Sequence, residues 1–144
     1  MLYFRLLLFC CISLFLIIKD IKSFILPDLY IILLFICLLF FDLFFNKEYI
    51  FLGIIGLIFA GTFFLIAYYS SGKKLGFGDV KYAAVIGYFL GIKYWVFAII
   101  LACFIAIIYF FVGHILWKWE THKKIPFGPF LAIGSVVINL WSIL

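Results

Sequence analysis

The sequence contains few charged residues. Asp, Glu, Lys and Arg together make up 12% of its 144 residues, whereas 70% of the side chains are hydrophobic. Globular proteins are typically about 45–50% apolar and about 25% charged, and a chain this small has too little interior to hide so many apolar side chains from water. The composition therefore excludes an ordinary soluble domain and predicts a protein whose partner is the lipid bilayer.

Several motifs of soluble enzymes are also missing. The four cysteines lie inside apolar stretches without CxxC spacing, which argues against a zinc site and against a disulfide framework. Neither histidine has a ligand-type residue at metal spacing, and no serine lies in a GxSxG motif. The basic residues form no block typical of nucleic-acid binding. We therefore predict no metal, no cofactor and no nucleic-acid partner.

Long apolar stretches recur along the chain. A membrane-crossing helix needs about 20 apolar residues, and six stretches account for most of the sequence. They are residues 2–18, 29–45, 49–69, 82–92, 94–117 and 125–144. The fourth has only 11 residues, so it is expected to extend backward past Asp79 or to remain a short helix inside the bundle. We predict an all-α polytopic membrane protein, with about six transmembrane helices in a single domain over residues 1–144.

The basic residues are distributed unevenly over the connections between these stretches. Eight lie in the first, third and fifth connections: Lys19, Lys22, Lys73, Lys74, Lys81, Lys118, Lys123 and Lys124. The opposite side has three, Arg5, Lys47 and Lys93. The positive-inside rule then places the odd connections in the cytoplasm of a plasma-membrane protein and both termini outside. Asp20, Asp28, Asp79 and Glu120 fall on the cytoplasmic side, and we interpret Asp42 as a charge at the opposite membrane interface.

Asp79 lies in the string GFGDVK, residues 76–81, at the start of the short fourth stretch. An ionised group near hydrocarbon is costly unless it is paired, hydrated or protonated, and the preceding glycines allow another chain to approach the backbone closely. Two interpretations stay open. Asp79 is either a catalytic carboxylate beside an extended peptide or an interfacial residue that caps a helix.

Asp20 ends the first apolar stretch on the same predicted side as Asp79. Two carboxylates held close together cannot both stay ionised, so they share a proton, and such a pair activates water for attack on a peptide carbonyl. The alternative for Asp20 is a solvated residue at a helix end, neutralised by Lys19 or Lys22.

Three strings in the sequence resemble motifs of one enzyme family. GFGDVK matches the GxGDxK signature of the polytopic GxGD aspartyl proteases, and the chain resembles their type IV prepilin peptidase branch. In that branch the first catalytic Asp ends a span and is followed after six residues by Pro and then Asn or Asp, as Asp20 is followed by Pro27 and Asp28. A late family segment close to IPFGPFLAxG corresponds to IPFGPFLAIG at residues 125–134.

The resemblance implies roles for individual residues. Asp20 and Asp79 correspond to the two catalytic aspartates. Gly76, Gly78 and Lys81 have supporting roles in the second motif, and for Lys81 we expect headgroup contact or loop ordering. Pro27 favours a helix start, so we expect Asp28 to be a structural capping residue rather than a third catalytic acid.

The late segment contains Pro126, Gly128 and Pro129, which delay or break the last helix. They are expected either to form a wall of the active-site pocket or to serve as a simple helix entry. Gly87 and Gly91 are expected at places where two helices contact each other closely, and the same holds for Gly53 and Gly61.

The resemblance also implies an activity and a substrate. The protein would be an aspartic endopeptidase that removes the short basic leader from prepilin-like proteins at the cytoplasmic membrane face. The zinc-binding CxxC domain of methylating relatives is missing, so we expect the short form, with cleavage and no methyl transfer. Two other functions stay open: a small transporter or channel that uses the same aspartates as an ion site, and an inactive assembly factor that binds pilin helices. The sequence does not indicate the oligomeric state.

Overall fold

The computed structural model describes residues 2–24, 26–73, 75–117 and 126–143 of the chain. It contains five helices: α1 (Leu2–Ser23), α2 (Asp28–Phe45), α3 (Lys47–Ser70), α4 (Phe77–Trp117) and α5 (Gly128–Ile143). No strand occurs in these ranges, which confirms the all-α prediction. The predicted features at Lys74, at residues 118–125 with their basic residues and Glu120, and at Leu144 lie outside the described residues.

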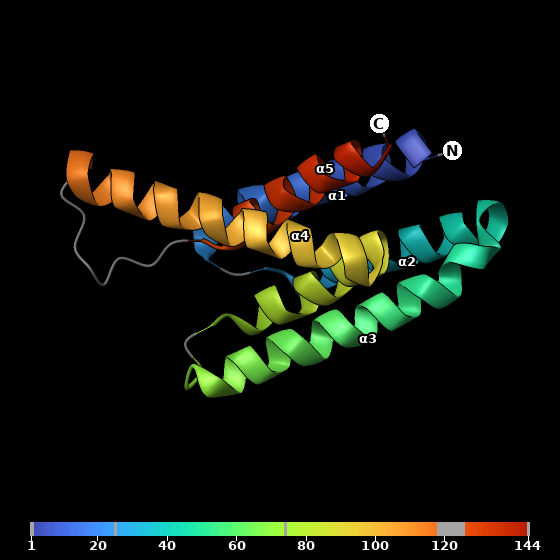
Figure 1. The fold of residues 1–144 in the computed structure, drawn as a ribbon, viewed down its shortest axis with the longest axis horizontal. Coiled ribbons are helices and arrows are strands. Elements are labelled where there is room, and N and C mark those ends of the chain that lie inside the picture. Colours follow the sequence, from blue (N-terminus) through green and yellow to red (C-terminus); the bar gives the residue numbers. More distant parts are fainter. Residues whose placement is uncertain (1, 25, 74, 118–125, 144) are drawn as a thin grey trace.

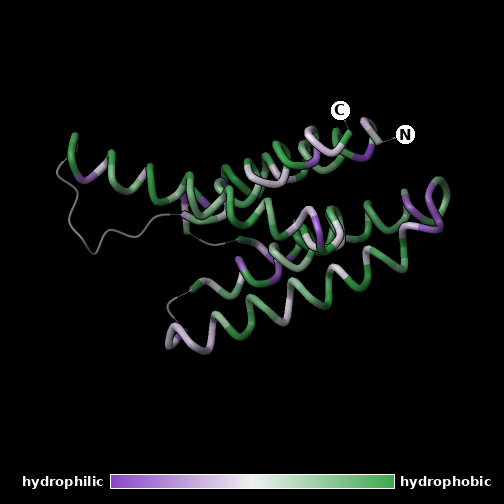
Figure 2. The backbone as a smooth tube through the Cα atoms, viewed as in Figure 1, coloured by the Kyte–Doolittle hydropathy of each residue, from purple (hydrophilic) through white to green (hydrophobic). Residues whose placement is uncertain are grey.

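The helices run back and forth between the two ends of an elongated bundle (Figure 1). α1 begins and α5 ends at the same end of this bundle, and the connections α1–α2 and α3–α4 lie at the other end. Hydrophobic residues follow the helices along most of their length (Figure 2). Large apolar side chains such as Phe44 and Phe51 are about three-quarters exposed, at 74% and 75%, which suits a lipid surrounding better than water.

The connection between α1 and α2 turns sharply. α1 ends when Phe24 adopts a left-handed backbone conformation, with φ 53°, and its N–H donates to the carbonyl of Asp20 at 2.8 Å. Pro27 is extended, with φ −67° and ψ 126°, and α2 begins at the next residue, Asp28. A proline before the first helical turn costs no hydrogen bond, since the N–H groups there have no helical partner.

α4 differs from the predicted fourth and fifth helices. It is one helical run of 41 residues that is broken only at Gly91, whose φ of 70° and ψ of 168° are not helical. The two parts lie side by side and run in opposite directions (Figure 1), and the indole Nε1 of Trp95 donates to the carbonyl of Ala83 at 3.1 Å between them. The reversal needs no polar loop, because glycine has no Cβ and tolerates a positive φ. The first part begins at Phe77, so the helix does extend backward past Asp79.

The number of helices that could cross a membrane is smaller than predicted. By length and composition, three of the helices in the described ranges are able to do so: α2, α3 and residues Phe77–Leu116 of α4. α5 is apolar but has only 16 residues, because the helix begins at Gly128 and not at residue 125. The structure thus supports membrane-crossing helices, but not six separate long ones.

Small residues bring α3 and α4 into backbone contact. A Cβ atom on Gly56 would collide with the carbonyl of Gly87, and one on Gly87 would collide with the carbonyl of Gly56. The predicted close helix contact is therefore found at Gly87. Gly91 also lies close to Gly56, since a Cβ on Gly56 would be 3.1 Å from the Gly91 Cα.

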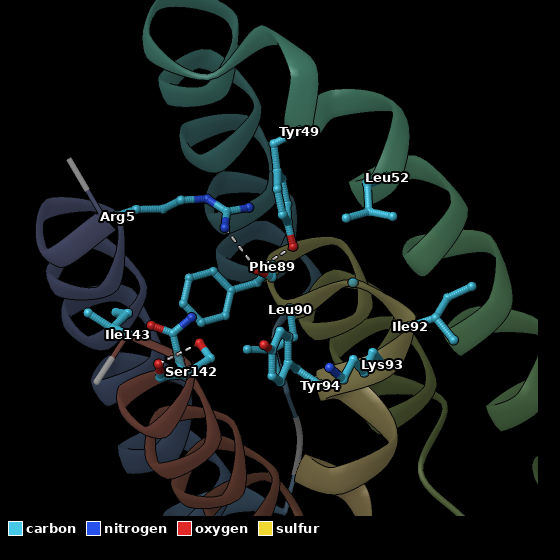
Figure 3. A pocket seen from close by; sticks show the side chains of 12 residues that line it. Arg5, Tyr49, Leu52, Phe89, Leu90, Ile92, Lys93, Tyr94, Ser142 and Ile143 are labelled. Carbon is cyan, nitrogen blue, oxygen red and sulfur yellow. Dashed lines mark hydrogen bonds between the residues drawn. The ribbon is translucent and has the colours of Figure 1, made fainter.

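A buried ion pair holds the end of the bundle near the termini. Nη2 of Arg5 lies 3.1 Å from Oδ2 of Asp42, and the two residues are 3% and 0% exposed. Nη1 of Arg5 and the hydroxyl of Tyr49 both donate to the carbonyl of Phe89, at 2.9 and 3.1 Å (Figure 3). In a continuous helix this carbonyl would bond to the amide four residues later, and the break at Gly91 intervenes. The prediction of Asp42 as an interfacial charge is wrong, because Arg5 neutralises it inside the protein.

Candidate active site

Asp20 and Asp79 meet at one small hollow, although 59 positions separate them. Asp20 is in the last turn of α1 and Asp79 in the first turn of α4. Both line a hollow of about 190 Å³ at the end of the bundle away from the termini. Its other lining residues are Phe24, Leu26, Gly76, Phe77 and Gly78. We call it the aspartate hollow.

Asp20 is held against the start of α5. Its side chain is buried, at 4% exposure, and its Oδ2 accepts a hydrogen bond of 2.9 Å from the backbone N–H of Gly128. That N–H belongs to the first turn of a helix, where amides have no helical partner and the helix dipole favours a negative charge. Asp20 lies outside the three apolar stretches that could cross a membrane. Burial raises the pKa of its carboxyl above the ordinary value, and the hydrogen bond from Gly128 acts in the opposite direction.

Asp79 has an unused hydrogen-bonding atom. Its Oδ1 is buried and has no hydrogen-bond partner among the described residues. The backbone amide of Gly76 faces the same carboxyl group. Buried carboxylate oxygens are normally paired, so an unpaired one beside a hollow is suited to bind water or a substrate group. This geometry brings the two predicted aspartates together.

Three glycines make room for this arrangement. A Cβ on Gly128 would lie 2.6 Å from Oδ2 of Asp20, and a Cβ on Gly76 would lie 2.9 Å from Oδ2 of Asp79. A Cβ on Gly78 would lie 2.8 Å from the Cβ of Leu26, which belongs to the connection between α1 and α2. Any side chain at these positions would force one of the carboxyl groups or the α1–α2 connection to move.

Lys81 and Asp28 form an ion pair beside the hollow. The Lys81 Nζ lies 2.6 Å from Oδ2 of Asp28, and both side chains are exposed to solvent, at 37% and 59%. Asp28 lies in the first turn of α2, and no side-chain cap hydrogen bond is found at the start of this helix. The pair joins the start of α2 to the start of α4. An exposed pair of this kind stabilises a protein by only about 0–1 kcal/mol. We therefore consider it for the elements that it connects and not for its contribution to stability.

The prolines of the late segment precede and begin α5. Pro126 comes directly before the turn at Phe127, and Pro129 is the second residue of the helix. The carbonyl of Phe127 accepts the amides of Phe130 and Leu131 at 3.1 and 3.2 Å. Neither proline lines the aspartate hollow, and the segment reaches the site through the amide of Gly128.

One protein-family model matches most of the chain. The family model of the type IV leader peptidases matches residues 7–111, a range that includes both Asp20 and Asp79. The chain belongs to the type IV leader peptidase family.

Two curated relatives have names that combine two activities. The prepilin leader peptidase/N-methyltransferase of Pectobacterium carotovorum subsp. carotovorum is 36% identical over 69 residues, which are 47% of this chain and 25% of that protein. The protein of the same name from Aeromonas salmonicida (strain A449) is 36% identical over 74 residues, 50% of this chain and 25% of that protein. The aligned part thus spans about a quarter of these relatives' length. No solved structure matches the chain.

A larger cavity of about 620 Å³ lies elsewhere in this leader peptidase family member. Arg5, Tyr49, Lys93, Asn139 and Ser142 line it together with apolar residues, and no side-chain carboxylate is among its described lining residues (Figure 3). Because peptide hydrolysis by aspartic chemistry needs paired acids, the smaller aspartate hollow is the candidate active site. No group of three His, Cys, Asp or Glu side chains that could hold a metal occurs in the part of the chain that the structure describes.

Sequence reasoning missed the apolar part of the hollow. Phe24, Leu26 and Phe77 line it beside the aspartates. Phe77 could have been noticed because it stands inside the GFGDVK string. Phe24 and Leu26 carry no comparable signal, since they are two of many apolar residues in this chain.

Proposed function

We propose that this chain is an aspartic endopeptidase that removes the short basic leader from prepilin-like proteins. One observation carries the proposal: Asp20 and Asp79, from different helices, line the same small hollow. The family membership and the leader peptidase names of the relatives support it.

The two carboxyl groups would share the work of hydrolysis. One carboxylate accepts a proton from water while the water oxygen attacks the carbonyl carbon of the scissile peptide bond. The other, protonated, donates its proton to the carbonyl oxygen. The tetrahedral intermediate then collapses: a hydroxyl proton returns to the second aspartate, the C–N bond breaks, and the leaving nitrogen takes up the proton that the first carboxyl group accepted from water. The products are a carboxylic acid and an amine, and the pair again holds one shared proton. Asp79 Oδ1, which lacks a partner among the described residues, is available for the water.

We further propose that the hollow faces the cytoplasm and that the chain crosses the plasma membrane several times. Lys19 and Lys22 lie near the end of α1, Lys73 follows α3, and Lys81 is near the start of α4. The α1–α2 and α3–α4 connections that they flank lie at the same end of the bundle (Figure 1), and these basic residues support a cytoplasmic position of that end. The described helices would act together as one catalytic domain.

The proposal is tested by incubating the full chain in lipid or detergent with a prepilin-like peptide and sequencing the products. Asp20→Asn and Asp79→Asn should each lower the cleavage rate by about 10²–10⁴-fold, the usual contribution of a positioned acid or base. Glu48→Gln is the matched control, because Glu48 is an exposed carboxylate in the first turn of α3, outside the hollow. Full activity of either Asn variant would remove the mechanism. Ion flux without any cleavage would indicate a transporter instead.

A further inference from the structure

The aspartate hollow has an apolar side that the proposed hydrolysis does not use. Phe24, after α1, and Phe77, at the start of α4, both line it, and they are 53% and 47% exposed. Asp20, by contrast, is only 4% exposed. The two aromatic rings are therefore accessible to a partner that reaches the aspartates.

Phe24 adopts a backbone conformation that does not suit its side chain. Its φ is 53°, in the left-handed region where a bulky residue is an outlier and glycine is the usual choice at a helix end. Such strain is concentrated at functional sites in proteins. A glycine would end α1 with less strain, so the backbone does not explain the presence of an aromatic ring at this position.

Phe77 is held from two sides. The ring of Tyr68 contacts it edge-on, with the centroids 5.5 Å apart, and the Lys81 Nζ lies 5.0 Å from its centroid. Lys81 is itself fixed by Asp28 at 2.6 Å. The ammonium group of Lys81 therefore lies against both an acid and the ring of Phe77.

We propose that Phe24 and Phe77 form a subsite for one apolar side chain next to the scissile bond, and that Lys81 is a positioning residue for Phe77. The inference rests on the proposed peptidase function. Pockets for whole small-molecule ligands measure about 300–1,000 Å³, so a hollow of about 190 Å³ suits a single side chain. Two rings favour an apolar group, and two carboxyl groups disfavour an acidic one.

The test compares peptides that carry Phe, Leu, Ala, Lys or Asp at each residue flanking the bond. Wild type should prefer Phe or Leu over Ala at one of these positions. Phe24→Gly and Phe77→Ala should reduce this preference at least tenfold in kcat/KM, a typical range for side-chain discrimination by an apolar pocket. Phe24→Gly also relieves the backbone strain, so loss of folding would not explain its effect. Phe51→Ala is the control, because Phe51 is 75% exposed on α3 and lies outside the hollow.

Lys81 is tested by two substitutions. Lys81→Met should raise KM for the preferred apolar peptide with little change in kcat, and Lys81→Arg should restore KM, because arginine keeps the ion pair and the contact with the ring. A purely structural role would lower the amount of folded protein and leave the KM of the remaining enzyme unchanged.

The outcomes separate this inference from the proposed function. Cleavage that depends on both aspartates but keeps its apolar preference in Phe24→Gly and Phe77→Ala would overturn the subsite alone. If wild type instead prefers Lys over Phe and the two variants lose that preference, the rings bind the basic leader. That result would also overturn the apolar subsite. If wild type cleaves no peptide of the series, the proposed function fails and the subsite with it.

Discussion

The backbone N–H of Gly128 donates a hydrogen bond of 2.9 Å to Oδ2 of Asp20 across 108 positions of sequence. Along the chain, it joins the first of the three motifs, which begins at Asp20, to the last, the segment IPFGPFLAIG. Because the donor is fixed in the first turn of α5, the orientation of the Asp20 carboxyl group depends on where that helix begins. Residues 126–134 can thus orient the Asp20 carboxyl group although none of them lines the hollow.

Gly128→Ala tests this relationship. The new Cβ would lie 2.6 Å from Oδ2 of Asp20, so the carboxyl group or the helix must shift. A misplacement of about 1 Å can cost about 10²-fold in rate, and we expect a loss of that order in kcat in a peptide cleavage assay. The control is Gly61→Ala, whose Cβ would meet only the Ala84 Cβ at 3.3 Å. Equal activity of both variants would contradict the positioning role of Gly128.

The rate of cleavage should depend on pH as a bell-shaped curve. The carboxyl pair works with a single shared proton, so activity is lost as pH falls and both groups are protonated, and again as pH rises and both are ionised. Burial raises the pKa of Asp20, which moves the active range to higher pH than for exposed carboxylates. Tryptophan fluorescence over the same range checks that the fold persists. A rate that rises continuously into alkaline pH would exclude the shared proton.

The sequence predicts the meeting of the two aspartates better than the path of the chain around them. The resemblance to the type IV prepilin peptidases assigns Asp20 and Asp79 as the catalytic pair, the distribution of basic residues predicts that they share one side of the membrane, and the structure brings them to one hollow. The helix start after Pro27 was also predictable, because proline acts locally. The shared side and the helix start depend on charge and on short-range chemistry, and both can be read along a single chain.

Features that depend on tertiary contacts were not predictable. Gly91 was interpreted only through close contact between helices, and its positive φ leaves no trace in an apolar stretch. Arg5 and Asp42 lie in different helices, and nothing in either local sequence indicates that they pair. In a chain that is 70% hydrophobic, the apolar pattern does not distinguish Phe24 and Phe77 from side chains that face lipid.

Gly91→Ala should destabilise the protein without changing the hollow directly. A φ of 70° with a ψ of 168° is a region that only glycine occupies readily, and forcing a side chain there costs about 1–3 kcal/mol. Thermal unfolding in detergent measures the loss. Gly61→Ala is the control, because Gly61 lies inside α3 without a positive φ and its Cβ would meet the Cβ of Ala84 at 3.3 Å. A stability equal to wild type would show that the reversal in α4 does not need glycine.

The buried pair of Arg5 and Asp42 provides the last prediction. Removing one partner leaves an unpaired charge inside the protein, which typically costs about 3–5 kcal/mol. We expect Asp42→Ala to lower the free energy of unfolding by that amount, while the folded fraction cleaves peptide with unchanged KM, because the pair lies outside the aspartate hollow. Lys93→Ala is the control, since Lys93 is exposed.

The double variant Arg5→Leu with Asp42→Leu distinguishes charge from packing. Replacing both members of a buried pair by apolar residues is often neutral, so this protein should be more stable than Asp42→Ala. It should stay less stable than wild type, because the carbonyl of Phe89 loses the Arg5 donor and keeps only the Tyr49 hydroxyl. A double variant as unstable as Asp42→Ala would mean that shape, and not the unpaired charge, determines the cost.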